Sequence, residues 1–239
     1  DEEEEWEKEI AARLNFMSMN CPDLQFPVKE CSKDMAHPTR GSWRRMKKVA
    51  RYLVGRRWVI WRYGWQDEPS RCYVPSDSDW GGSCRDRRST SGGCWMLGSH
   101  CVKTWSATQQ AYALSSAEAE LYGMVESVTR AKGLLTLAQE MGFDRMSNVI
   151  TLDTDSSAAK RFVSRRGLGR MRHLQIRDLW IQKEVGEGRL EVRKVAGDQN
   201  PADLMTKSLR IGHMESRLDR IGLRAEWMDS GGSDSARMR

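Results

Sequence analysis

The sequence lacks the features that mark membrane and secreted proteins. It has no apolar run near the ~20 residues that a membrane-spanning helix requires, and its mean hydropathy is −0.67. The segment Asp1–Glu5 is acidic, whereas a secretory signal begins with basic residues and continues with apolar ones. We therefore expect neither membrane insertion nor secretion.

Zinc-binding and disulfide frameworks are also missing. The six cysteines form no CxxC pair and have no histidine at zinc-ligand spacing. This pattern indicates reduced thiols in an intracellular protein.

Charge is the most informative part of the composition. The 239 residues carry a net charge of +6, and an acidic run stands at the N-terminus while arginines cluster elsewhere. This distribution favours an anionic polymer as a partner. The length has room for one full-sized domain with attachments.

Hydrophobic periodicity predicts a helical segment upstream of an α/β domain. We expect residues 1–12 to be a solvated acidic leader. A helix is predicted over Gly41–Gly55, with Trp43, Met46, Ala50 and Leu53 on its apolar face. A turn at Asp67–Ser70 predicts a domain boundary near residue 70.

The remainder alternates between strand and helix patterns. Strands are predicted at Cys72–Asp79, Gly92–Gly98, Cys101–Ser106, Asn148–Thr154 and Arg189–Val195, and helices at Ser115–Phe143, Ser156–Val163, His173–Val185 and Pro201–Leu209. Three hairpin-linked strands followed by alternating helices and strands predict a mixed five-stranded sheet with flanking helices, preceded by a small helical segment.

Four carboxylates fall at places where such a fold could bring them together: Asp77, Glu120, Asp155 and Asp203. Clustered carboxylates repel one another unless a cation neutralises them. Mg²⁺ prefers oxygen ligands, and two ions about 3.5–4 Å apart can activate a water and stabilise a leaving oxygen in phosphodiester displacement.

Local patterns separate only one pair of neighbouring acids. The run from Ser115 to Glu118 fits a capping box, which engages Glu118 with the helix end and favours Glu120 as the free carboxylate. Asp77 and Asp79 share a strand face, so periodicity leaves both open. Asp153 and Asp155 raise the same ambiguity, and Asp155 could instead cap the helix that follows.

Five segments resemble the ribonuclease H domain of copia-type retrotransposons. They are Ser76–Gly82, Asp86–Gly92, Trp105–Ser106, Ser115–Glu120 and Asn200–Lys207. The resemblance implies a ribonuclease H-like fold and metal-ligand roles for Asp77, Glu120, Asp155 and Asp203. It also implies a hydrolase, an endonuclease that uses two Mg²⁺ or Mn²⁺ ions to cut the RNA strand of RNA–DNA hybrids during reverse transcription.

The resemblance further implies a division of the chain. Residues 13–70 look like a thumb or connection remnant of reverse transcriptase, 71–210 like the ribonuclease H domain, and 211–239 like a C-terminal tail. The expected partners are an RNA–DNA hybrid and the polymerase domain of the parent polyprotein. The expected location is the cytoplasm, a virus-like particle or the nucleus.

Three departures from the family pattern stand out. The segment Val195–Asn200 lacks the histidine that many ribonucleases H carry, Cys21 stands where a basic residue is usual, and Gly93 stands where an aromatic residue is usual. An inactive or domesticated nucleic-acid-binding module is therefore the alternative. Candidate phosphate contacts for either function are Arg87, Arg88, Ser89, Thr90, Lys160 and Arg161.

Overall fold

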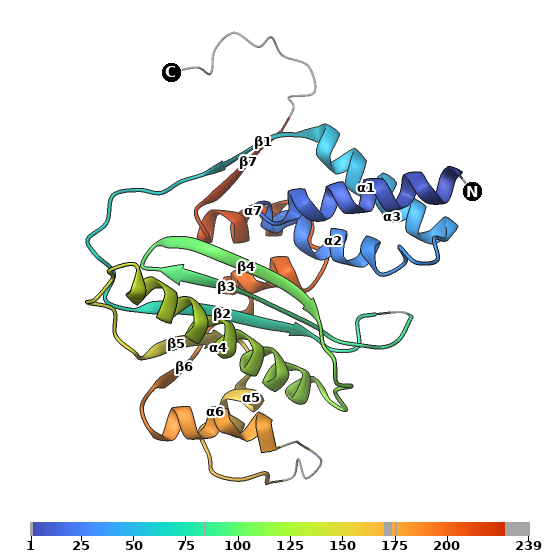
Figure 1. Cartoon of the computed structure of the whole chain (residues 1–239). Coiled ribbons are helices and arrows are strands. Elements are labelled where there is room, and N and C mark those ends of the chain that lie inside the picture. Colours follow the sequence, from blue (N-terminus) through green and yellow to red (C-terminus); the bar gives the residue numbers. More distant parts are fainter. Residues whose placement is uncertain (1, 84, 170–173, 175, 228–239) are drawn as a thin grey trace.

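The computed structural model describes residues 2–83, 85–169, 174 and 176–227, and a mixed five-stranded sheet lies at its centre (Figure 1). Its strands are β2 (Cys72–Asp79), β3 (Thr90–Leu97), β4 (His100–Thr108), β5 (Ile150–Thr154) and β6 (Leu190–Lys194). The order is β4-β3-β2-β5-β6. Strands β2, β3 and β4 are antiparallel, whereas β5 is parallel to both β2 and β6. The predicted mixed sheet with flanking helices is confirmed.

Both faces of the sheet carry buried apolar side chains. Every residue of β3 is buried, and its side chains alternate between two cores. Trp95 and Leu97 pack into the core that contains α4 (Ser116–Glu140), whereas Cys94 and Met96 pack with Met205 and residues of α7 (Ile211–Arg220). Strand β3 therefore packs against α4 through one face and against η2 and α7 through the other (Figure 1).

The long helix α4 approaches the sheet closely because it carries small residues there. A Cβ added at Gly123 would lie 3.3 Å from the backbone oxygen of Asp77. One turn further on, the Ser127 hydroxyl donates to Ser76 Oγ at 2.9 Å. Larger side chains would hold the helix away from β2 and from the carboxylates near its end.

The remaining helices fill the edges of the sheet. Helix α5 (Ser157–Val163) follows β5, and α6 (Ile176–Gly186) precedes β6. His173, where a helix was predicted to begin, lies outside the described residues. A short 3-10 turn, η1 (Gly197–Gln199), leads to a second, η2 (Pro201–Met205), where an α-helix to Leu209 was predicted.

Close packing fixes η2 against the sheet. Asn200 caps it by accepting from the backbone N–H of Ala202, and its amide donates to the carbonyl of Ser76 at 2.9 Å. A Cβ at Gly92 would lie 2.7 Å from Met205 Cβ. The turn is thus pinned to β2 and β3, which explains why it remains short and tightly wound.

The segment upstream of the sheet is helical. It contains α1 (Glu2–Ser18), α2 (Pro22–Ser32) and α3 (Arg40–Gly55). The expectation of a solvated leader differs from the structure, because α1 buries Ala11 and Leu14 in a core with α2 and α3. Trp43 is 38% exposed rather than buried, since α3 turns Ser42, Met46 and Val49 inward instead.

A second, two-stranded sheet joins distant parts of the sequence. Strand β1 (Arg56–Trp61) pairs antiparallel with β7 (Leu223–Trp227). Beside it, Asp23 of α2 accepts hydrogen bonds from both Arg56 and Tyr52. The predicted domain limits at residues 12, 70 and 210 stay a prediction. No helix among the described residues is long and apolar enough to cross a membrane.

Candidate active site

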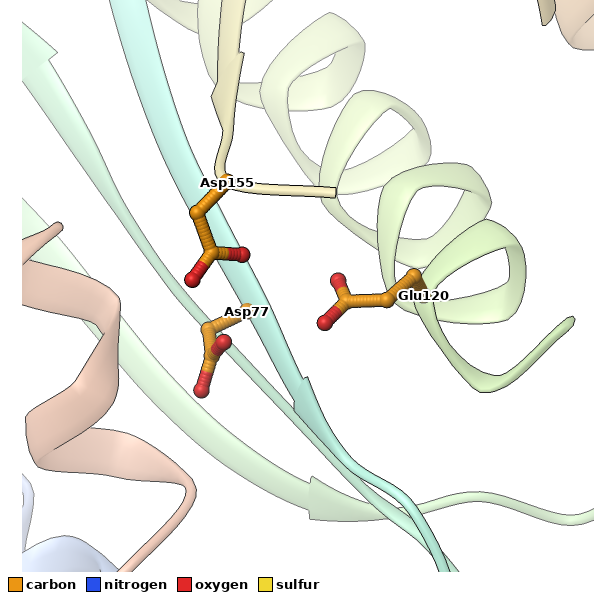
Figure 2. A group of neighbouring side chains, drawn as sticks. All are labelled: Asp77, Glu120 and Asp155. Atoms are coloured by element: carbon orange, nitrogen blue, oxygen red, sulfur yellow. The ribbon is translucent and has the colours of Figure 1, made fainter. Parts of the chain in front are cut away.

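Three of the four predicted carboxylates converge at one end of the sheet. One oxygen from each of Asp77, Glu120 and Asp155 lies within 4.8 Å of the other two. Figure 2 shows the three side chains pointing toward one another from strand β2, helix α4 and the end of β5. Residues far apart in the sequence thus form one acidic cluster.

The parallel pairing of β2 and β5 brings two of these residues together. Pro75 is the register partner of Asp153. Asp77 lies two residues after Pro75 and Asp155 two residues after Asp153, so the two carboxylates lie beside each other at the carboxyl ends of β2 and β5. Asp155 does not cap α5, because Ser156 is the N-cap residue and accepts from the backbone N–H of Ala159.

The first turns of α4 separate Glu118 from Glu120. Ser115 caps the helix by accepting from the Glu118 backbone N–H. The Glu118 carboxylate is buried and accepts from the Leu114 N–H at 2.9 Å and the Tyr122 hydroxyl at 2.7 Å. Glu118 therefore serves the helix end, and Glu120 faces the other carboxylates, as the capping pattern predicted.

The other neighbouring acids point elsewhere. Asp153 forms a bidentate ion pair with Arg193 of β6, at 2.8 and 2.9 Å. Asp79 lies against the backbone of the loop after β2, since a Cβ at Gly82 would overlap its carboxylate. Neither belongs to the cluster formed by the described residues.

Asp203 lies beside the cluster and faces cations. It is buried in η2, where Lys207 Nζ lies 2.6 Å from its Oδ1 and Arg217 Nη2 lies 3.1 Å from its Oδ2. The same Lys207 ammonium is 3.6 Å from Asp77 Oδ2. Asp203 is therefore connected to Asp77 through a lysine, and is not one of the three converging residues.

Burial and mutual repulsion make the cluster electrostatically costly. Burial raises the pKa of Glu120 to about 9, with further contributions from the charges of Asp77 and Asp155. Burial also raises the pKa of Asp77 to about 6, against the opposing effects of Lys207 and a hydrogen bond from Thr206. A bound cation would reverse both shifts.

The donor set fits a hard divalent cation. All three groups offer carboxylate oxygens, which Mg²⁺ and Mn²⁺ prefer. Glu120 Oε2 is buried and has no hydrogen-bond partner among the described residues. A metal ion would satisfy this oxygen, so Asp77, Glu120 and Asp155 are the residues that would hold one.

The predicted phosphate contacts divide into two groups. Arg87 and Arg161 are exposed, while Arg88 and Lys160 are half-buried. Ser89 and Thr90 are buried, and their hydroxyls accept from the Gly81 N–H and from Lys29 Nζ. The hydroxyls of Ser89 and Thr90 are thus engaged in hydrogen bonds inside the protein.

Lys207, Thr206 and Arg217 were not predicted as site residues, although all three contact the predicted carboxylates. Lys207 and Thr206 stand within a segment that carried the family resemblance. Arg217 has no comparable signal, because α7 was predicted as part of a tail.

Comparison with known proteins yields relatives of one main kind. No family model matches the chain. The retrovirus-related Pol polyprotein from transposon TNT 1-94 of Nicotiana tabacum is 26% identical over 90% of this chain and 16% of its own length. The corresponding polyprotein from transposon RE2 of Arabidopsis thaliana is 28% identical over 90% of this chain and 15% of its own length.

A third relative, the secreted RxLR effector protein 161 of Plasmopara viticola, is 32% identical over 51% of this chain and 85% of its own length. Among solved structures, ribonuclease H1 from Halobacterium salinarum NRC-1 aligns at 14% identity with a TM-score of 0.40, covering 57% of this chain and 94% of that one. The chain spans about 15% of the length of the Pol polyproteins that it matches over 90% of its own. Over 90% of its length the chain is therefore similar to retrotransposon Pol polyproteins, and the order and directions of its five strands are those expected of the ribonuclease H-like fold.

Proposed function

We propose that this chain is a metal-dependent endonuclease that hydrolyses the RNA strand of RNA–DNA hybrids. The observation that carries the proposal is the convergence of Asp77, Glu120 and Asp155 from three separate elements. Such a cluster is costly to bury unless it binds a cation. Helix α5, which carries Lys160 and Arg161 in its last turn, begins two residues after Asp155.

A divalent ion at these carboxylates would supply Lewis acidity and orient a water molecule for attack on phosphorus. The chain's own residues hold that position rigidly. Asp77 is fixed by the Thr206 hydroxyl, and Glu120 by the helix that packs on β2. The site is therefore suited to phosphodiester hydrolysis.

We infer the substrate from the similarity to retrotransposon Pol polyproteins together with the charge of the chain. Discrimination of RNA from DNA relies on the 2′-hydroxyl and on helix shape, without base specificity. Arg87, Arg88, Lys160 and Arg161 are candidates to contact the phosphates, since each is at least partly exposed. We further propose that the chain works intracellularly with the polymerase domain of its parent polyprotein.

Cleavage of a labelled RNA–DNA hybrid in Mg²⁺ and in Mn²⁺ tests this function. Single-stranded RNA and duplex DNA serve as substrate controls. Asp155→Asn should lose at least about 10²-fold in rate, because it removes a ligand from the cluster. Asp153→Asn is the matched control, since Asp153 pairs with Arg193 outside the cluster.

Hybrid-specific cutting that Asp155→Asn abolishes and Asp153→Asn retains supports the proposal. Equal loss in both variants would point to general disruption of β5 instead. Hybrid binding without cutting in either metal would overturn the nuclease and favour the nucleic-acid-binding module.

A further inference from the structure

A buried glutamine lies where strands β2, β3 and β4 meet the start of α4. Gln109 directly follows β4, is 5% exposed, and donates from its backbone N–H to the Ser89 carbonyl at 2.8 Å. A buried polar side chain requires hydrogen-bond partners. Those of the Gln109 side chain come from three separate elements.

The amide nitrogen of Gln109 donates to all three elements. It lies 3.1 Å from Ser78 Oγ on β2, 3.0 Å from Ser91 Oγ on β3 and 2.8 Å from the carbonyl oxygen of Ala119 on α4. The Ala119 carbonyl can only accept, and this fixes the amide with its nitrogen toward the helix. One side chain thus ties α4 to two strands of the sheet.

Two of these partners adjoin Glu120. Ala119 precedes it in α4. Ser78, which follows Asp77 on β2, donates a backbone hydrogen bond to the Glu120 carboxylate, and this bond lowers the pKa of Glu120 against the larger effect of burial. Gln109 therefore holds both the helix residue before Glu120 and the strand residue that binds its carboxylate.

The other polar atom of the Gln109 amide is unpaired. Its Oε1 is buried and has no hydrogen-bond partner among the described residues. A buried acceptor without a donor costs free energy, so the stability of the fold alone would favour an apolar side chain of similar length here. The amide is better explained by what its nitrogen holds in place.

We propose that Gln109 is a positioning residue of the nuclease, which sets the direction of the Glu120 carboxylate toward the other two carboxylates of the cluster. This inference rests on the proposed function. The amide acts through the Ala119 carbonyl and the Ser78 hydroxyl. Without it, the chain should still fold, while the first turns of α4 and the Glu120 side chain are held less firmly against β2.

Gln109→Met tests this role, because methionine matches the length of glutamine and has no N–H donors. Mn²⁺ affinity, measured by calorimetric titration, should fall about 10-fold or more. The kcat for hybrid cleavage should fall about 10–10²-fold with little change in KM. The Tm of the metal-free protein should shift by no more than about 4 °C. Gln110→Met is the matched control, since Gln110 is the next residue and is exposed, and it should change none of these quantities.

A second arm asks whether Gln109 acts through Glu120. In a Glu120→Gln background, Gln109→Met should cause no further loss of Mn²⁺ affinity, because the carboxylate that it positions is already absent. A role confined to packing would instead weaken binding equally in both backgrounds. If Gln109→Met does not fold, Gln109→Asn takes its place, since its amide is one methylene too short to reach Ala119.

The outcomes separate this inference from the proposed function. A folded Gln109→Met protein with unchanged Mn²⁺ affinity and kcat would overturn the role of Gln109 while the nuclease stands, and equal losses in both backgrounds would do the same. A loss of Mn²⁺ affinity that occurs only where Glu120 is present would support the role even where cleavage is absent. Failure of the unmodified chain to cut any hybrid counts against the proposed function alone.

Discussion

Glu120 experiences the greatest electrostatic cost of any residue at the site. It is half-buried beside two other carboxylates, and its pKa rises to about 9. In the metal-free protein, the folded state therefore retains a proton at neutral pH that the unfolded chain releases near pH 4.5. The stabilisation from this proton is complete below pH 4.5 and is lost as the pH rises through about 9.

This difference predicts a pH-dependent stability. In the presence of a chelator, the free energy of unfolding should fall between pH 5 and pH 9, and Glu120→Gln should remove up to about 1.4 kcal/mol of that fall for each pH unit. Saturating Mg²⁺ should also reduce the slope, because a cation favours the ionised carboxylates. Thermal unfolding across this pH range checks the prediction, and an equal slope in both proteins would contradict it.

The two glutamates at the start of α4 should respond in opposite ways. Glu118→Gln weakens the bonds to Leu114 and Tyr122, and should lower the free energy of unfolding by about 1–2 kcal/mol while leaving Mn²⁺ affinity unchanged. Glu120→Gln should lower Mn²⁺ affinity by about 10-fold or more, with no loss of metal-free stability at pH 8. Urea unfolding and metal titration on both variants distinguish them, and reversed effects would reassign the two residues.

At the scale of elements, the contact between α4 and β2 sets the position of Glu120. At Gly123 the helix approaches β2 closely, because a Cβ added there would lie 3.3 Å from the Asp77 carbonyl oxygen. Gly133, ten residues along the same helix, has open space around it. The two glycines therefore provide a matched pair for testing how packing positions the cluster.

Gly123→Leu should destabilise the protein by about 1–3 kcal/mol and weaken metal binding, because the added side chain forces α4 away from β2. Gly133→Leu should instead stabilise it by about 0.5–1 kcal/mol through higher helix propensity. Chemical denaturation and metal titration measure both effects. Unchanged metal affinity in a destabilised Gly123→Leu protein would show that Glu120 does not depend on this contact.

Elements with strong local patterns could be predicted from the sequence, and those decided by distant partners could not. The strand Cys72–Asp79 has the predicted bounds, and Ser115 caps the long helix as predicted, although the Glu118 carboxylate accepts from the Leu114 N–H instead of the Ser115 N–H. On α3, Met46 can share an apolar face with either Trp43 or Val49. The periodicity predicted the face that contains Trp43, whereas the structure buries Val49. The stripe that faces inward depends on the helices that pack against α3, which no local pattern contains.

The same limit applied to the site. Glu120 could be separated from Glu118 because the capping box is local, and the geometry agrees. The ion pairs of Asp203 depend on Lys207 and on Arg217 of a separate helix. A contact between η2 and α7 has no signature in residue spacing, so the ion pair of Asp203 with Arg217 could not be foreseen.

At the scale of the whole molecule, the carboxylate site depends on residues beyond its predicted domain. Arg217 lies past residue 210, and Met214 and Leu218 of the same helix pack with Leu204 and Met205. Helix α7 in turn leads to β7, which pairs with β1. The site is thus linked to the upstream segment through a continuous set of contacts.

A chain of residues 71–210 should therefore be much less stable than the full chain. It loses Arg217, whose removal from a buried ion pair alone costs about 3 kcal/mol, and it exposes the apolar side chains of η2. Arg217→Met in the full chain should reproduce the first part of this loss. Comparison of Tm for the three proteins checks the prediction, and a 71–210 chain as stable as the full chain would establish the boundary at 210.

The pairing of β1 with β7 also bears on how the chain folds as it is made. Trp61 and Leu223 are register partners, so β1 leaves the ribosome roughly 10–30 s before its partner strand at usual rates of synthesis. The five-stranded sheet can form within that interval, whereas β1, with Trp58 and Ile60 exposed even in the final structure, offers an unpaired edge to other chains. Losses to aggregation during synthesis should therefore begin at β1, and they should be smaller where a chaperone covers that strand until β7 arrives.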